Sequence, residues 1–214
     1  MADTLADLKT RIADEIARTD LTSQIASAIT SAINYYEKKR FYFNEMRSLT
    51  FSTVAAQEFY SSTDATGIAQ LTDIDRVRIT ISTSQVYDLE AENYDVLDAT
   101  SQSTTSDQGQ PIWYAYYARQ FRLYPIPNAV YTVRISGVKS LTALSAGTDS
   151  NAWTTEADAE PLIRMRAKAD LYANVIRDDD EALKFKALEK EEFAALRSRT
   201  TNLGASGKIM ATTF

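Results

Sequence analysis

The sequence predicts an α+β fold: an antiparallel helical bundle of two N-terminal and two C-terminal helices, with an inserted antiparallel β domain and an extended C-terminal arm. Apolar residues recur every three or four positions near both ends of the chain, which is typical of helices with one buried face. The chain between them is rich in Thr, Val, Ile and Tyr, with stretches that alternate apolar and polar residues, which is typical of strands. We therefore expect the bundle in residues 1–47 and 154–198, the β domain in residues 48–153 and the arm in residues 199–214.

The first two helices are predicted from two apolar stripes. The first stripe consists of Leu5, Leu8, Ile12 and Ile16, and the second of Ile25, Ile29 and Ile33. Asp3 or Thr4 is a suitable N-cap for the first helix, and the second begins near Leu21 or Thr22. Only a few residues connect the two stripes, and such a short link favours an antiparallel pair.

The middle of the chain is predicted to form strands joined by turns. We expect residues 49–53 and 57–60 to be the two arms of a hairpin. Pro125 and Pro127 cannot donate to a strand ladder, so the strand that contains them ends there or lies at a sheet edge. Further strands are expected at 75–82, 85–90, 111–119, 120–127 and 129–138, a short helix at 91–99 and polar loops at 100–110 and 139–153.

Helical periodicity returns after the β region. The third helix begins at Thr155, or near Ala159 if the following Pro lies in its first turn. The acidic residues 178–180 interrupt the pattern and are suited to cap the fourth helix. Residues 200–214 contain two Gly and five Ser or Thr, so we expect an arm without a core of its own.

Composition excludes several classes of function. The 214-residue chain has no Cys, so it has neither disulfides nor thiolate metal sites, and it has no His, the commonest general base. Residues 202–209 have the outline of a phosphate-binding loop but lack its first Gly and its final Ser or Thr. The acidic run at 178–181 lacks the spacing of a calcium loop, and a helix cap explains it. We predict no catalytic, metal or cofactor site and no enzymatic activity.

Charge and hydropathy limit the partners. The net charge is −6, and residues 51–150 carry six basic and eleven acidic side chains. Such a segment repels phosphate, which argues against a module that grips DNA. No run approaches the roughly 20 apolar residues of a membrane-spanning helix, and the acidic N-terminus is unlike a signal or transit peptide. We expect no membrane partner.

An aromatic stretch, IWYAYYARQFRLYP (112–125), is the strongest candidate for a binding surface. Tyr is enriched at protein interfaces, so we expect an interface with another protein here. Its aromatics also interleave with basic residues, which is typical of sheets that stack bases, so a module for single-stranded nucleic acid is the alternative. The interface residues would be Trp113, Tyr114, Tyr116 and Tyr117.

A second stretch, YYEKKRFYFNE (35–45), lies where the second helix gives way to the β region. Its basic residues lie near a helix C-terminus, where the dipole favours cations. The alternation of Phe41 and Phe43 predicts an extended segment with Tyr42 on the opposite side. We therefore expect a joint between bundle and β domain that also forms an edge between subunits. The joint residues are Tyr36, Arg40, Phe41, Phe43 and Asn44.

Several short motifs occur in a fixed order along the chain. The second helix ends in Y-x-x-x-R-F-x-F-N-E (36–45), which is followed by T-F-x-T (50–53). The aromatic strand leads into L-Y-P-x-P (123–127), and W-x-x-x-A (153–157) precedes the second helical pair. This order resembles the head-to-tail adaptor (connector) proteins of tailed bacteriophages, in particular those of short-tailed phages.

The resemblance implies a structural virion protein, with no catalytic site, that forms a ring of usually twelve copies beneath the portal. Its partners would be other copies of itself, the portal protein and the next tail protein, nozzle or tube, which docks on the β part. Genomic DNA would pass through the channel without specific binding. The protein would assemble in the host cytoplasm and reside in the virion at the head–tail interface. The arm residues that would contact the portal are Leu203, Lys208, Ile209, Met210 and Phe214.

Overall fold

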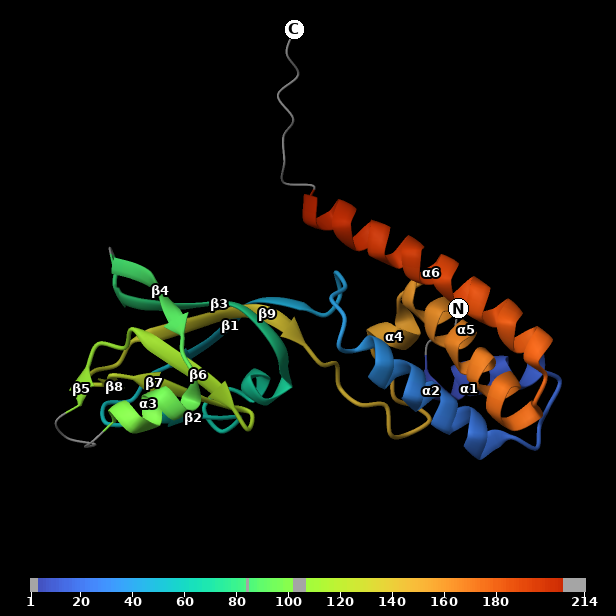
Figure 1. Ribbon diagram of the computed structural model, residues 1–214, viewed down its shortest axis with the longest axis horizontal. Coiled ribbons are helices and arrows are strands. Elements are labelled where there is room, and N and C mark those ends of the chain that lie inside the picture. The colour runs from blue at the N-terminus through green and yellow to red at the C-terminus, as the bar shows by residue number, and fades with distance from the viewer. Residues whose placement is uncertain (1–3, 84, 102–106, 206–214) are drawn as a thin grey trace, which may run out of the picture. The chain divides into compact units, whose positions relative to one another are not determined.

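The computed structural model describes residues 4–83, 85–101 and 107–205, and it divides the chain into two compact units (Figure 1). The helical unit comprises Met1–Phe43 and Leu141–Phe214, and the strand unit comprises Asn44–Ser140. Each unit has its own hydrophobic core. Leu141 and Leu144 pack against the helical core, so the segment that follows Ser140 belongs with the helices. The prediction of an α+β protein is confirmed, with six helices and a curled seven-stranded sheet in the described residues.

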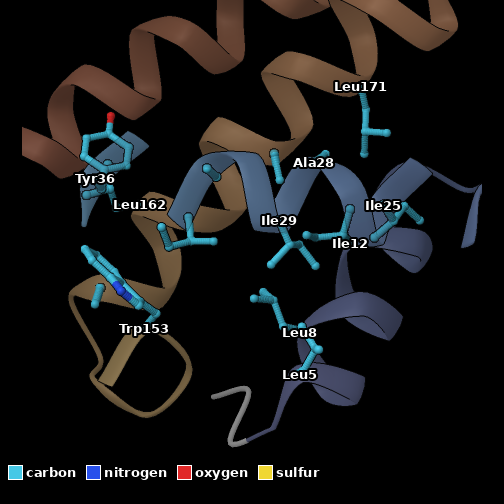
Figure 2. Close-up of a cluster of buried hydrophobic side chains, with 14 of the residues drawn as sticks. Leu5, Leu8, Ile12, Ile25, Ala28, Ile29, Tyr36, Trp153, Leu162 and Leu171 are labelled. Atoms are coloured by element: carbon cyan, nitrogen blue, oxygen red, sulfur yellow. The ribbon is translucent and has the colours of Figure 1, made fainter. Parts of the chain in front are cut away.

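One helix of the helical unit, α5 (Ala159–Leu171), packs against four others. They are α1 (Leu5–Glu15), α2 (Thr22–Tyr36), α4 (Ala152–Thr155) and α6 (Asp179–Ala205). A π-helical turn, η2 (Tyr172–Ile176), extends α5 and ends at Arg177, whose φ of 62° lies in the left-handed region. The apolar stripes of α1 and α2 meet α5 and Trp153 in one core (Figure 2).

The predicted helix starts agree with the structure. Thr4 caps α1, where its hydroxyl accepts from the Asp7 N–H and the Asp7 carboxylate accepts in return. The Asp178 carboxylate accepts from the Glu181 N–H at 3.1 Å at the start of α6. Of the two starts considered for the third long helix, Ala159 is the observed one, and the short helix α4 precedes it.

The fourth predicted helix is longer than expected. The extended arm was placed from residue 199, but α6 continues through Ala205, so the first seven residues of that range are helical. Arg199 forms an ion pair with Asp158, and the Thr200 and Thr201 hydroxyls donate to the carbonyls four residues earlier. The ion pair connects α6 to the start of α5, and the two hydroxyl bonds are made within α6. The rest of the predicted arm, residues 206–214, lies outside the described residues.

The strand unit forms one seven-stranded sheet in the order β1-β9-β3-β4-β6-β7-β2, and β5 pairs with β8 in a small second sheet. The unit also contains a 3-10 helix, η1 (Thr66–Gln70), and α3 (Tyr94–Thr100). The strands are β1 (Glu45–Ser52), β2 (Phe59–Tyr60), β3 (Leu71–Ser82), β4 (Gln85–Ala91), β5 (Gln108–Gly109), β6 (Trp113–Tyr117), β7 (Gln120–Tyr124), β8 (Ile126–Pro127) and β9 (Thr132–Lys139).

Two predictions about the sheet are wrong. β1 and β2 do not form a hairpin, since β1 pairs with β9 and β2 pairs with β7. Thr53 continues alongside β9 by exchanging hydrogen bonds with Tyr131, which carries the chain past the position of a tight turn. The sheet is also not purely antiparallel, because β4–β6 and β5–β8 are parallel pairs. Helix α3 lies in the connection between β4 and β6, and a parallel pair requires such a crossover.

The two ends of the strand unit are neighbours in the sheet. Glu45 pairs with Val138, and the Asn44 carbonyl accepts from the Lys139 N–H at 2.9 Å. Gly137 lies where β9 crosses bulges in both neighbouring strands, and a Cβ there would be 2.1 Å from the Asp73 carbonyl oxygen. The entry and exit strands of the insertion thus lie side by side, as expected for an insertion at one loop.

Candidate functional site

The aromatic residues of the predicted joint are packed inside the helical unit. Phe41 and Phe43 stack on each other with ring centroids 5.5 Å apart, and both meet Trp153 edge to face. Residues 42–44 form a turn, so the predicted extended segment is wrong. A turn allows Phe41, Tyr42 and Phe43 all to reach the same core. These rings anchor the end of α2.

Tyr36 joins a buried polar network with α5 and α6. Its hydroxyl donates to the Glu189 carboxylate at 2.5 Å, and Arg166 donates to the same oxygen at 3.0 Å. Burial, with help from the Glu189 charge, raises the pKa of the Tyr36 phenol, which therefore stays protonated. Glu189 is itself buried, so this network fixes the middle of α6 against α2 and α5.

Of the three basic residues in the joint, Lys39 is held by aromatic rings of the helical unit. The Lys39 ammonium lies 4.4 Å from the Phe193 ring centroid and 4.7 Å from that of Tyr35, in cation–π contacts. Arg40 is exposed. Tyr42 donates to Glu156 at 2.7 Å, and burial raises the pKa of Tyr42 to about 12. Asn44, the last predicted joint residue, is buried in the strand unit.

The aromatic strand β6 is divided between core and surface. Tyr114 is buried, and the half-buried Tyr116 packs on the same core, where its hydroxyl donates to the Ile68 carbonyl at 2.8 Å. Tyr117 is 67% exposed, and the half-buried Trp113 stacks on Tyr124. Of the four predicted interface residues, Trp113 and Tyr117 therefore retain the most surface for a partner.

Of the two arginines in the aromatic stretch, Arg119 is exposed and Arg122 makes internal contacts. Arg122 is only 4% exposed and donates to Glu58 at 2.5 Å and to Asp98 at 2.9 Å. Its guanidinium also lies 5.0 Å from the Tyr94 ring centroid. A cation held by two carboxylates does not serve a phosphate, which weakens the case for a base-stacking sheet.

The outer face of α2 is unusual for an exposed helix. Thr22–Tyr36 contains no charged residue, although 24% of the whole chain is charged. A shallow depression lies on this face, lined by Ala26, Ser27, Thr30, Ser31 and Asn34. The Thr30 hydroxyl donates to the Ala26 carbonyl, so its hydrogen bond is made within the helix. The side chains that line the depression are short, and short side chains allow another helix to approach closely.

Two ionic networks were not predicted from the sequence. Glu15 accepts from Lys168 and Arg164, each at 2.7 Å, and connects α1 to α5. Burial of Glu15 opposes ionisation, but these hydrogen bonds outweigh it and lower the pKa of Glu15. The second network is that of Glu189. Glu189 lies between Phe185 and Phe193 on the apolar stripe of α6, and this position could have predicted the network. A carboxylate that is buried within an apolar stripe needs a hydrogen-bonding or charged partner.

The described part of the chain contains neither a cluster of metal-binding side chains nor a helix suited to span a membrane. Across residues 4–83, 85–101 and 107–205, we find no group of three or more acidic side chains arranged to hold a metal ion. In the same ranges, no helix combines the length and the apolar character that crossing a bilayer requires. Of the predicted arm residues, Leu203 lies half-exposed near the end of α6, and Lys208, Ile209, Met210 and Phe214 lie outside the described residues.

The chain matches a family of known proteins. A family model described as SU10 adaptor protein matches residues 3–209. This range covers nearly the whole helical unit and all of the strand unit. No curated protein matches the chain.

Proposed function

Because this chain belongs to the SU10 adaptor protein family, we propose that it forms a ring, of twelve copies, that joins the portal vertex of a phage head to the tail. The family is one of structural phage proteins that join head and tail, and it is not a class of enzymes. The observation that carries the proposal is the family match over residues 3–209. The virion would be that of a short-tailed phage, with the ring assembled in the host cytoplasm.

We assign different partners to the two units. The helical unit, as an antiparallel bundle, packs against its copies in the ring, and residues 206–214 with the end of α6 reach the portal. Trp113 and Tyr117 on the strand unit meet the downstream tail protein, the nozzle or tube. The support is that both side chains keep exposed surface in a unit with seven basic and eleven acidic residues, a net charge of −4.

The ring extends the channel through which DNA leaves the head, without specific contacts to DNA. The support is electrostatic: the chain carries a net charge of −6, and phosphate contacts need a surplus of basic residues. Salt-dependent binding of single-stranded oligonucleotides by the purified protein would contradict this proposal and favour the nucleic-acid alternative.

The direct test is electron microscopy of the purified protein with and without its portal protein. We expect a ring of twelve copies on the portal. A truncation before residue 206 should remain folded, because it leaves α6 whole, but should no longer assemble with the portal. A double substitution of Trp113 and Tyr117 by Ser should still assemble with the portal and fail to recruit the tail protein. A protein that stays monomeric and does not bind the portal protein would refute the proposed function.

A further inference from the structure

We infer that the outer face of α2 in one copy receives the exposed face of α6 from the next copy, as an antiparallel helix pair repeated around the ring. The inference rests on the proposed function, because a closed ring larger than a dimer needs two different surfaces that complement each other. The helical unit offers two such faces on helices that both pack on α5 (Figure 1).

The receiving face is the stripe of Ser23, Ser27, Ser31 and Asn34 on α2. These side chains are exposed, short and uncharged, and the last three of them line the depression on α2. A solvated helix face is normally rich in charged residues. The charges appear only beyond the two ends of the stripe, as Asp20 before the helix and Lys38 after it, and both are exposed.

The inserting face is the stripe of Leu183, Ala187, Lys190 and Ala194 on α6. Its spacing of four, three and four residues places these side chains on one side of the helix, and all four are exposed. Leu183 is 63% exposed, which is more than any other Leu of the described residues. Asp180 precedes this stripe and Arg197 follows it.

The two stripes match in length, and the charged residues beyond their ends are complementary in sign. Ser23 to Asn34 and Leu183 to Ala194 each span eleven positions, about 16 Å at the ~1.5 Å rise of a helix. An antiparallel pairing places Ser31 beside Ala187. The charged ends then meet as Lys38 with Asp180, and Arg197 with Asp20.

The reverse orientation is excluded by the same charges. A parallel pairing would bring Asp20 to Asp180 and Lys38 to Arg197, and both contacts would be repulsive. Asp20 is already in an ion pair with Arg18, so the contact of Lys38 with Asp180 decides the orientation. Neither Lys38 nor Asp180 forms an ion pair with another residue that the structure describes.

The chain has no Cys, so an engineered disulfide reports the contact directly. Ser31→Cys and Ala187→Cys are made in separate full-length chains, mixed, assembled with the portal protein and oxidised. On a non-reducing gel, we expect the mixture to show a band of two disulfide-linked chains. Each variant alone should show only the band of a single chain. A chain with both substitutions should form a ladder of linked copies. Val130→Cys, on an exposed residue of the strand unit, replaces Ala187→Cys in the control mixture and should not cross-link with Ser31→Cys.

Charge reversal tests the orientation. Lys38→Glu and Asp180→Lys should each reduce the assembled fraction, and the two together should restore it, with circular dichroism showing that all three variants are folded. A portal-bound ring in which Ser31→Cys and Ala187→Cys do not cross-link would overturn the inference and leave the proposed function intact. Linkage of Ser31→Cys to itself would also overturn it, since that requires a symmetric dimer. Failure of the native chain to bind the portal would overturn the proposed function.

Discussion

Replacing Tyr36 by Phe removes one oxygen from the buried network that holds α6. The hydroxyl donates to the Glu189 carboxylate at 2.5 Å, and Tyr36 is only 3% exposed. The aromatic ring remains, so its contacts with the neighbouring rings, such as Phe193 at 5.6 Å, are kept. The substitution therefore isolates the contribution of one hydrogen bond to a charged acceptor.

The expected loss of stability follows from the chemistry of that bond. Hydrogen bonds to charged groups contribute roughly 1.5–3 kcal/mol, and Glu189 keeps its bond from Arg166 in the variant. We expect the free energy of unfolding of the helical unit to fall by about 2 kcal/mol. In a chain of this size, that corresponds to a fall in Tm of about 4–8 °C.

The assay must follow the helical unit alone, because two units need not unfold together. The two Trp residues make this possible, since Trp153 lies in the helical unit and Trp113 in the strand unit. With Trp113 replaced by Phe throughout, fluorescence during urea unfolding reports on Trp153. Amide hydrogen exchange should also show faster exchange in α6 around Glu189.

The neighbouring tyrosine provides a matched control. Tyr35 is 48% exposed, and no hydrogen bond joins its hydroxyl to the described residues. Tyr35→Phe should change the free energy of unfolding by less than about 0.5 kcal/mol. If Tyr36→Phe behaves like Tyr35→Phe, the network does not hold α6 and the reasoning is wrong.

Three further changes test other parts of the molecule. The pKa of Glu15 is lowered from its ordinary 4.5, so the ionised carboxylate stabilises the fold above pH 4.5, and this stabilisation is lost as the pH falls through the lowered pKa. In urea titrations at a series of pH values, Glu15→Gln should therefore lose less free energy of unfolding on acidification than the native chain. Arg122→Met should destabilise the strand unit by about 3 kcal/mol in Trp113 fluorescence, because it removes a buried cation that Glu58 and Asp98 share and leaves the half-buried Glu58 carboxylate unpaired. Gly137→Ala should destabilise the same unit by about 3 kcal/mol, because its Cβ would meet backbone that cannot move aside.

Each of these changes has a control. Asp14→Asn, on an exposed carboxylate of α1, should leave the acid profile unchanged. Arg119→Met, on an exposed neighbour of Arg122, should change stability by less than about 0.5 kcal/mol. Gly204→Ala, where no atom lies within 4 Å of the added Cβ, should be neutral or stabilising in α6. Equal effects of a change and its control would contradict the corresponding argument.

Periodicity predicted the helices well because it records burial along one element. Leu5, Leu8 and Ile12 on α1 and Ile25 and Ile29 on α2 are all buried in the helical core. The caps at Thr4 and Asp178 were also predictable, since both act within three residues of themselves. The end of α6 was misplaced because Arg199 is held by Asp158, which is distant in the sequence.

The strand pairing of the sheet could not be predicted from the sequence. The segments 49–53 and 57–60 are close enough along the chain to suggest a hairpin, yet β1 and β2 lie at opposite edges of the sheet. The prediction of a protein interface on β6 was limited for the same reason. The alternation in β6 showed that one face is buried, but only the tertiary structure shows that Tyr114 and Tyr116 lie on the core and that Arg122 is held by Glu58 and Asp98.

What the sequence determined by itself was the α+β class, the buried faces of α1 and α2, the absence of His and Cys, and a resemblance to phage adaptors that the family match bears out. The tertiary structure decided the strand order, the length of α6, and which residues near YYEKKRFYFNE are core and which are surface. The reason is physical. Capping and helical periodicity are local interactions between residues a few positions apart. The strand pairs β1–β9 and β2–β7, and the contact that buries Tyr36 against Glu189, join segments that are distant in the sequence.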